Sequence, residues 1–214
     1  MTPPLESTPP MVAALYVLPD GPYAGREDVD LWPESRDARL YSGPWPGIFH
    51  PPCARWGRYW SGGPSAAGRY KGGDDAGCFA AALAAVRRWG GVLEHPEASH
   101  AWRAFRLPKP PRAGGWVRGL CGGWCCCVEQ GHYGHRVRKP TWLLYYGPEP
   151  PELIWGPAPQ REKMDLGFHS TEERRRAVAA GFVAPARLSN RERTLTPEPF
   201  AELLIGLARL ARPT

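Results

Sequence analysis

Three short segments of the chain carry side chains that could act together on a pyrimidine ring. The first has Cys53 directly after two prolines, the second has Glu94, and the third has Arg136 and Arg138. A thiolate is a strong nucleophile, a carboxyl group can give or take a proton, and guanidinium groups hold anionic or polar atoms. The combination indicates covalent catalysis.

Carbon-6 of a pyrimidine suits this combination. Attack by a thiolate there turns carbon-5 into an enamine-like nucleophile, which can take up an electrophile such as a methyl group. The reaction needs a reactive thiol, an acid or hydrogen-bond donor for ring N3, and cations that hold the base and its backbone. Cys53, Glu94, and the pair Arg136 and Arg138 would fill these roles in that order.

The same residues resemble the catalytic core of DNA cytosine-5 methyltransferases. In that family a Pro-Cys thiol attacks the ring, the glutamate of a Glu-Asn-Val element protonates N3, and a Gln-x-Arg-x-Arg element braces the site. Cys53, Glu94, Arg136 and Arg138 match those positions, and the likeness covers residues 45–146. It implies DNA as the partner and S-adenosylmethionine as the donor. The layout is also similar to small phage-encoded methyltransferase-like proteins with little or no target-recognition domain.

The chain departs from that family at several positions. A Phe-x-Gly-x-Gly loop for S-adenosylmethionine is expected after the first strand, but residues 19–22 read Pro-Asp-Gly-Pro. His95 replaces the asparagine after the glutamate, and His135 replaces the glutamine before the arginines. Residues 190–206 weakly resemble the last motif of the family, which packs on the cofactor pocket. The cofactor-binding residues therefore stay unassigned, and target specificity must come from loops.

A basic and aromatic loop follows Cys53. The formal net charge of the chain is +6 and its pI is near 9.1, which favours an anionic partner. Aromatic and cationic side chains together can hold unstacked bases and phosphates. We expect DNA contacts from Arg55, Trp56, Arg58, Tyr59, Lys71 and His135.

The local pattern predicts the elements that position these residues. Apolar runs predict buried strands at 12–18, 46–49 and 92–96, and an amphipathic helix should join the second strand to the third. Such a βαβ unit has parallel strands, and ligands collect at their carboxyl ends. Cys53 and Glu94 should therefore reach one rim. Residues 23–46 show no sustained period and are predicted to be mostly loop.

The rest of the chain completes one domain. Strands are predicted at 125–129 and 141–146, a charged helix at 171–180, and an amphipathic helix at 197–210. We expect a single, loop-rich α/β domain over residues 11–214, with a mostly parallel, Rossmann-like methyltransferase sheet. Residues 1–10 are predicted to be a disordered lead.

Six cysteines invite two other interpretations. Four of them crowd between Cys121 and Cys127, too close together for a disulfide framework, so we expect reduced thiols. Zinc bound with His132 and His135 is an alternative, but neighbouring residues of a strand point to opposite faces, and packed thiols are favoured with no metal expected. The chain shows no signal peptide or long apolar run, which predicts a cytoplasmic protein, in the host cytoplasm if it is phage-encoded.

Alternatives remain open for each role. Cys53 can be an inert buried thiol, Glu94 a carboxylate paired with Arg87 or Arg88, and Arg136 and Arg138 a solvated basic edge. A pyrimidine-modifying enzyme could use another one-carbon donor, or water for deamination. A DNA-binding or decoy protein without catalysis would also explain the basic charge and the missing glycine-rich loop.

Overall fold

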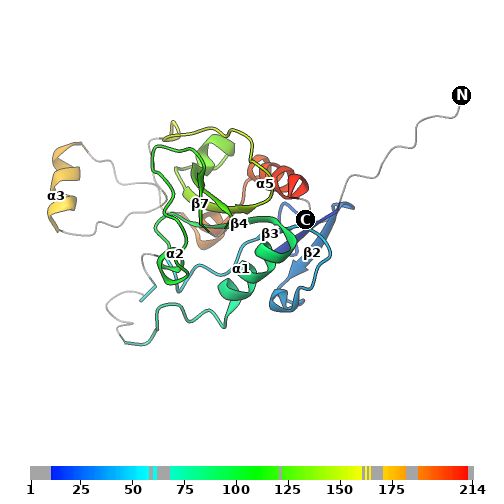
Figure 1. The fold of residues 1–214 in the computed structure, drawn as a ribbon. Coiled ribbons are helices and arrows are strands. Elements are labelled where there is room, and N and C mark those ends of the chain that lie inside the picture. Colours follow the sequence, from blue (N-terminus) through cyan, green and yellow to red (C-terminus); the bar gives the residue numbers. More distant parts are fainter. Residues whose placement is uncertain are drawn as a thin grey trace, which may run out of the picture.

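The computed structural model describes residues 11–57, 60–61, 68–120, 122–160, 162, 164, 171–181 and 188–211, so the lead at residues 1–10 lies outside the described residues. The chain forms a single α/β domain, with helices beside a central sheet (Figure 1). This sheet has seven strands in the order β2-β1-β3-β4-β7-β6-β5. The strands are β1 (Val12–Val17), β2 (Val29–Pro33), β3 (Gly47–Phe49), β4 (Gly91–Pro96), β5 (Val117–Arg118), β6 (Trp124–Glu129) and β7 (Pro140–Tyr146).

Few helices accompany this sheet. They are α1 (Cys78–Trp89), α2 (His100–Ala104), α3 (Thr171–Ala179), α4 (Asn190–Thr194) and α5 (Glu198–Leu210), together with the 3-10 turns η1 (Ala38–Leu40) and η3 (Gln130–Tyr133). None of the helices described is long and apolar enough to cross a membrane.

One half of the sheet is parallel. β1 pairs in parallel with β2 on one side and with β3 on the other, and β3 pairs in parallel with β4. The βαβ unit β3-α1-β4 is thus confirmed. Most of residues 23–46 is irregular, as predicted, but the prediction missed β2 and η1, which lie in this segment. β2 is an edge strand whose residues beyond Val29 are only half-buried, so it lacks the apolar run that marks the inner strands.

The other half of the sheet is antiparallel. β4 pairs with β7, β7 with β6, and β6 with β5, all in opposite directions. The sheet is therefore mixed, and parallel pairing is confined to β2, β1, β3 and β4. The direction of β7 matters for the site, because the start of β7 lies beside the carboxyl end of β4, where Thr141 is opposite Pro96.

α1 covers one face of the sheet. The Asp75 carboxylate accepts the N–H groups of Gly77 (3.0 Å) and Phe79 (2.8 Å), which satisfies donors at the start of the helix. Phe79, Leu83 and Val86 are buried in one cluster with Phe49 and Leu93 of the sheet. The helix thereby fixes the spacing of β3 and β4.

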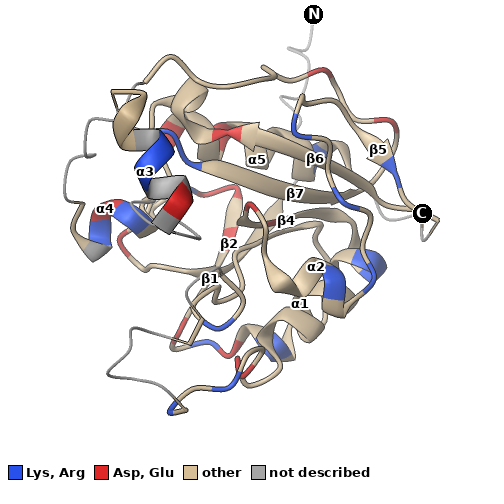
Figure 2. Ribbon diagram, turned by 90° about the vertical axis from the view of Figure 1, so that its left-hand side faces the viewer, with Lys and Arg blue, Asp and Glu red and all other residues tan. Residues whose placement is uncertain are grey.

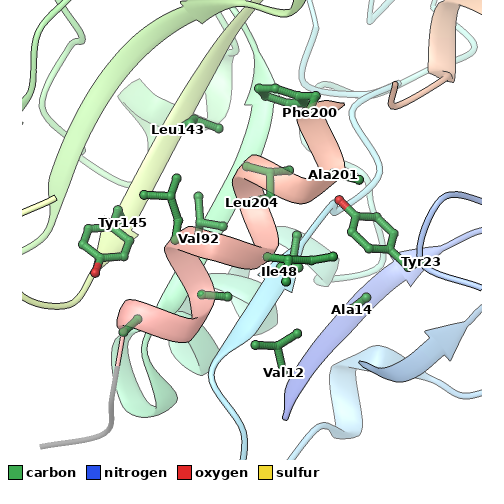
Figure 3. Close-up of a cluster of buried hydrophobic side chains, with 14 of the residues drawn as sticks. Val12, Ala14, Tyr23, Ile48, Val92, Leu143, Tyr145, Phe200, Ala201 and Leu204 are labelled. Carbon is green, nitrogen blue, oxygen red and sulfur yellow. The ribbon is translucent and has the colours of Figure 1, made fainter. Parts of the chain in front are cut away.

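α5 covers the opposite face, so the domain has three layers. Its side chains Phe200, Ala201 and Leu204 pack against Ile48 and Val92 of the central strands (Figure 3). Both faces of the central strands are therefore buried, and ligands must approach them at an edge where the strands end.

Candidate active site

Cys53 lies in a tight turn just beyond β3. Its carbonyl oxygen accepts the N–H groups of Trp56 (3.0 Å) and Gly57 (2.8 Å). The residue is partly buried and its thiol is free of a disulfide. The turn therefore holds the backbone of the predicted nucleophile firmly at the carboxyl end of β3.

Glu94 lies within β4, two residues before its end. One carboxylate oxygen is 3.0 Å from Nδ1 of His50, and the other accepts a long hydrogen bond of 3.4 Å from the amide of Gln130. The side chain is 13% exposed, so the carboxylate is nearly shielded from water but keeps an open side.

A chain of polar groups extends from this carboxylate. Nε2 of His50 is 2.9 Å from the hydroxyl of the buried Tyr23, and the Gln130 amide also donates to Oγ1 of Thr141 (2.9 Å). Burial, and then the charge of Glu94, raise the pKa of Tyr23, which keeps it a phenol. His50 thus connects the two groups, with Nδ1 beside Glu94 and Nε2 beside the Tyr23 hydroxyl.

Lys139 supplies a positive charge that acts on both predicted reactive groups. Its side chain is buried, and its Nζ donates to the carbonyl of Leu195 (2.9 Å). Burial lowers the pKa of this lysine, whereas Glu94 and Cys53 oppose that shift. Lys139 reaches this edge because it directly precedes β7, which runs antiparallel to β4.

The charges at this edge set the protonation of Cys53 and Glu94. Burial raises the pKa of the Cys53 thiol, the Glu94 carboxylate raises it further, and Lys139 lowers it. Burial opposes ionisation of Glu94 as well, but the hydrogen bond and charge of His50, with Lys139, hold its pKa below the usual range. The site at rest therefore has a protonated thiol beside a carboxylate.

The two predicted arginines, Arg136 and Arg138, form ion pairs with carboxylates other than Glu94. Arg136 pairs with Glu192 at 3.0 Å on the surface, and Arg138 pairs with the buried Glu129 at 2.9 Å. In the part of the chain that the structure describes, the cation that acts on Cys53 and Glu94 is Lys139. Arg136 and Arg138 thus support the loop before β7.

His95 and His135, where the resemblance expects asparagine and glutamine, are both buried. His135 is 3% exposed, and its ring nitrogens contact the carbonyls of Val137 (2.9 Å) and Glu192 (3.3 Å), a position that does not favour contact with DNA. His95 contacts the Ser99 hydroxyl through Nδ1 (2.7 Å) and stacks on Trp102. Burial lowers the pKa of His95 to about 4, against opposing charges and the carbonyls of Pro51 and Pro52.

The loop after Cys53 contains part of the predicted DNA contacts. Arg55 and Trp56 line a hollow of about 470 Å³ together with residues of α2, and Lys71 is exposed. Arg58 and Tyr59 lie outside the described residues. Lysine and arginine residues occur on α1, α2, α3, α4 and β5 rather than on one element (Figure 2).

A second hollow of about 320 Å³ follows the carboxyl end of β1. It is lined by Asp20, Gly21 and Pro22 and by residues 195–198 ahead of and at the start of α5. These are the segments where the resemblance expects the cofactor loop and the last motif. The chain after β1 forms turns rather than a glycine-rich loop leading into a helix.

The clustered cysteines behave as packed thiols in the strand. Cys125 and Cys127 are buried in the cluster under α1, and Cys126 in the cluster under α5, on the opposite face. Cys121 lies outside the described residues. Among the residues described, no group of three or more histidine, cysteine or acidic side chains is arranged to hold a metal ion.

Sequence reasoning missed Tyr23, His50, Gln130 and Lys139. His50 stands three residues before Cys53 and Lys139 directly after Arg138, so both lay within segments already singled out. The contacts of Gln130 and Lys139 depend on the pairing of β7 with β4 and of β6 with β7, which no local pattern specifies. Comparison of the chain with protein-family models, with curated proteins and with solved structures found no match.

Proposed function

We propose that the protein modifies cytosine in DNA through a covalent adduct between Cys53 and carbon-6 of the base. The observation that carries this proposal is geometric: Cys53 follows β3, Glu94 is near the end of β4 and Lys139 directly precedes the antiparallel β7, so all three belong to one edge of the sheet. A nucleophile, a proton carrier and a cation at one site are the parts that such an addition requires. Transfer of a methyl or related group to carbon-5 is the most direct outcome.

The first step can be written with its protons balanced. The thiol proton of Cys53 passes to Glu94 and from there to N3 of cytosine, while sulfur bonds to carbon-6. The carbon-5–carbon-6 double bond and the carbon-4–N3 double bond become single bonds, and a carbon-4–carbon-5 double bond forms, which makes the ring an enamine. Carbon-5 then attacks the donor. A water molecule then takes the proton from carbon-5, the bond between carbon-6 and sulfur breaks, and the carbon-5–carbon-6 double bond forms again, while the proton on N3 returns through Glu94 to the departing Cys53 sulfur.

Lys139 and His50 have distinct roles in this step. The ammonium group of Lys139 stabilises the thiolate as the proton leaves, because an opposite charge favours ionisation. His50 orients the Glu94 carboxylate through its Nδ1 contact and is itself held by Tyr23. A carboxylate fixed in this way is presented to the ring rather than to solvent.

S-adenosylmethionine is the proposed donor, by resemblance alone. It supplies an electrophilic methyl group when bound. The hollow beyond β1 offers the carboxylates of Asp20 and Glu198, which suit ribose hydroxyls, and apolar surface from Leu195 and Pro197. Asp20 already pairs with Arg191, and Glu198 with Arg26. The residue types of the hollow therefore fit a ribose, but both carboxylates have partners.

A trapping experiment tests the adduct. DNA that contains 5-fluorocytosine is incubated with the protein, with and without S-adenosylmethionine, and the mass of the denatured protein is measured. Fluorine at carbon-5 blocks the final elimination, so we expect a stable protein–DNA adduct after methyl transfer. Cys53→Ser should abolish it, whereas Cys78→Ser, a change at another partly buried thiol, should not. An adduct that survives Cys53→Ser would refute the proposal.

Two results separate the alternative functions. An adduct that forms only with a different one-carbon donor would replace S-adenosylmethionine and keep the role of Cys53. DNA binding with no adduct under any donor would favour a non-catalytic DNA-binding protein, a candidate favoured by the raised pKa of Cys53 and by the turn after β1. Mass analysis of nucleosides from cells that express the protein reports a modified base without presuming a donor.

A further inference from the structure

The hollow beside the Cys53 turn has features of a ligand site of its own. It lies between the loop after β3 and α2, and its lining includes Arg55, Trp56, Trp60, Gly73 and Arg103. A volume of about 470 Å³ is within the range of about 300–1,000 Å³ that small-molecule sites occupy. It can hold a base together with its sugar and phosphate.

The Trp56 ring forms a wall that is fixed before any ligand arrives. Its indole N–H donates to Asp75 (2.8 Å), and its ring packs against Phe79 and Phe105 with centroids 5.9 Å away in each case. Gly73 lies against this ring with φ +79°, and a Cβ at that position would come within 2.7 Å of the ring. A preformed aromatic surface is a platform on which a planar base can stack.

The second wall is tied to the first through the backbone. Nη1 of Arg55 donates to the carbonyl of Trp60 (3.0 Å), and the Arg55 guanidinium lies 3.5 Å from the centre of the Tyr70 ring. The backbone N–H of His100 donates to the carbonyl of Trp56 (2.8 Å), which links α2 to the loop. These hydrogen bonds therefore fix the positions of Trp56 and Trp60 relative to α2.

The charge of the lining has one sign. Arg55 and Arg103 contribute guanidinium groups and His100 an imidazole, while no aspartate or glutamate is among the described residues that line the hollow. Arg103 and His100 are exposed on α2. Guanidinium groups bind phosphate through paired N–H donors, so an aromatic hollow with this rim is complementary to a ligand with a flat ring and a phosphate.

We propose that this hollow binds one nucleotide, with its base against Trp56 and Trp60 and its phosphate at Arg55 and Arg103. This inference rests on the proposed function, because the bound nucleotide would neighbour the cytosine that reaches Cys53. The turn supports that geometry, since the Cys53 carbonyl accepts the N–H of Trp56. A free nucleotide and a nucleotide within a single strand share the same recognition chemistry.

Photocrosslinking tests the site directly. The Cys53→Ser protein is irradiated with 5-iododeoxyuridine monophosphate, or with a short single-stranded oligodeoxythymidylate that carries one 5-iodouracil, and the crosslinked peptides are identified by mass spectrometry. The serine variant excludes any adduct at the thiol. We expect crosslinks at Trp56 or Trp60. Crosslinks to the oligonucleotide alone mean a strand-bound nucleotide, and crosslinks to the monophosphate alone mean a free one; either supports the site.

Two variants that each lose one arginine separate a contact in the hollow from a change in net charge. Arg103→Gln removes one phosphate partner and should weaken binding of the same probes about tenfold, the loss expected for a charge-assisted hydrogen bond. Arg88→Gln removes an equal charge from the end of α1, where Arg88 lies over Trp89, and should leave the affinity unchanged. Crosslinks only outside the hollow, or equal affinity for Arg103→Gln and the unaltered protein, would overturn the proposal.

The two proposals can fail separately. A 5-fluorocytosine adduct without crosslinks at Trp56 or Trp60 would refute the nucleotide hollow and leave the role of Cys53 intact. Crosslinks in the hollow without an adduct at Cys53 would keep the hollow as a nucleotide site and refute the proposed catalysis.

Discussion

The pKa of the Cys53 thiol depends on its burial and on two opposite charges. Burial and the Glu94 carboxylate raise the pKa of its thiol, and Lys139 lowers it. Glu94→Gln should therefore lower the pKa and speed alkylation of Cys53 by iodoacetamide at neutral pH several-fold, whereas Lys139→Met should raise the pKa and slow it. Peptide mapping measures alkylation of the Cys53 peptide separately from the peptides that carry the other five cysteines.

Adduct formation with cytosine should respond to Glu94→Gln in the opposite direction. A glutamine cannot carry a proton to N3, and loss of a proton carrier typically slows a reaction about 10²–10⁴-fold. The 5-fluorocytosine adduct should therefore form at least about a hundredfold more slowly, although the thiol itself reacts faster with iodoacetamide. If both rates fell together, Glu94 would be a structural support for Cys53 and not a proton carrier.

His95 should make the stability of the protein depend on pH. Its folded pKa is lowered from 6.5 to about 4, so between these values the unfolded chain binds a proton that the folded chain does not. The free energy of unfolding should fall as the pH drops through this window, by up to about 3 kcal/mol. His95→Phe should flatten this dependence in urea unfolding.

Glu94 also makes stability depend on pH, but in a lower pH range than His95. The pKa of Glu94 is lowered below 4.5, so its contribution to stability is present above 4.5 and is lost only as the pH falls further. The comparison of His95→Phe with the unaltered protein therefore belongs between pH 6.5 and 4.5. An unchanged slope in that range would mean that His95 does not titrate as its burial predicts.

At the scale of elements, β3 and β4 depend on one glycine contact. Gly91 pairs with Gly47 at φ +111°, and a Cβ on Gly91 would lie 2.0 Å from the Gly47 carbonyl oxygen. Gly91→Ala should lower the free energy of unfolding by about 3 kcal/mol or more in urea titrations, because both strands carry buried core residues. The matched change Gly206→Ala, where no atom lies within 4 Å in α5, should instead stabilise by about 0.5–1 kcal/mol.

Local sequence patterns predicted the elements whose burial is visible as an apolar run or an apolar face in their own residues. The strands β1, β3, β6 and β7 have buried apolar runs, and α1 and α5 have one apolar face, so the periodicity of their burial is visible in the chain. The edge strand β2 is half-buried and carries no such signal. Its place depends on pairing with β1, which is a long-range property.

The candidate site likewise contains residues that the local sequence predicted and residues that it did not. Cys53 and Glu94 could be assigned to one edge from the βαβ pattern, since parallel strands end together. Lys139 and Gln130 could not, because they reach that edge only through the antiparallel pairing of β7 with β4 and of β6 with β7. The arginines of the same segment were predicted instead, although their partners are Glu192 and Glu129.

For the whole molecule, some of the described arginines pair with carboxylates, whereas others line the hollow beside the Cys53 turn. Arg26, Arg36 and Arg209 form ion pairs with carboxylates near β2 and α5. Arg55 and Arg103 line the nucleotide hollow next to the Cys53 turn. A pair of opposite charges has little net attraction for phosphate, so long-range attraction of DNA should be directed to the second group.

The salt dependence of single-stranded DNA binding tests this division. Each phosphate that a cation neutralises contributes about −0.7 to the slope of log affinity against log salt for a single strand, because condensed counterions are released. Arg103→Gln should therefore make the slope shallower by about 0.7, and affinity should fall most at low salt. Arg36→Gln removes the same charge, but Arg36 lies 2.7 Å from Asp30, so its slope should match that of the unaltered protein. A slope that is equally shallower in both variants would mean that net charge, and not the hollow, governs DNA binding, and equal slopes for all three proteins would mean that Arg103 contacts no phosphate. A shallower slope for Arg103→Gln alone would assign one phosphate contact to α2.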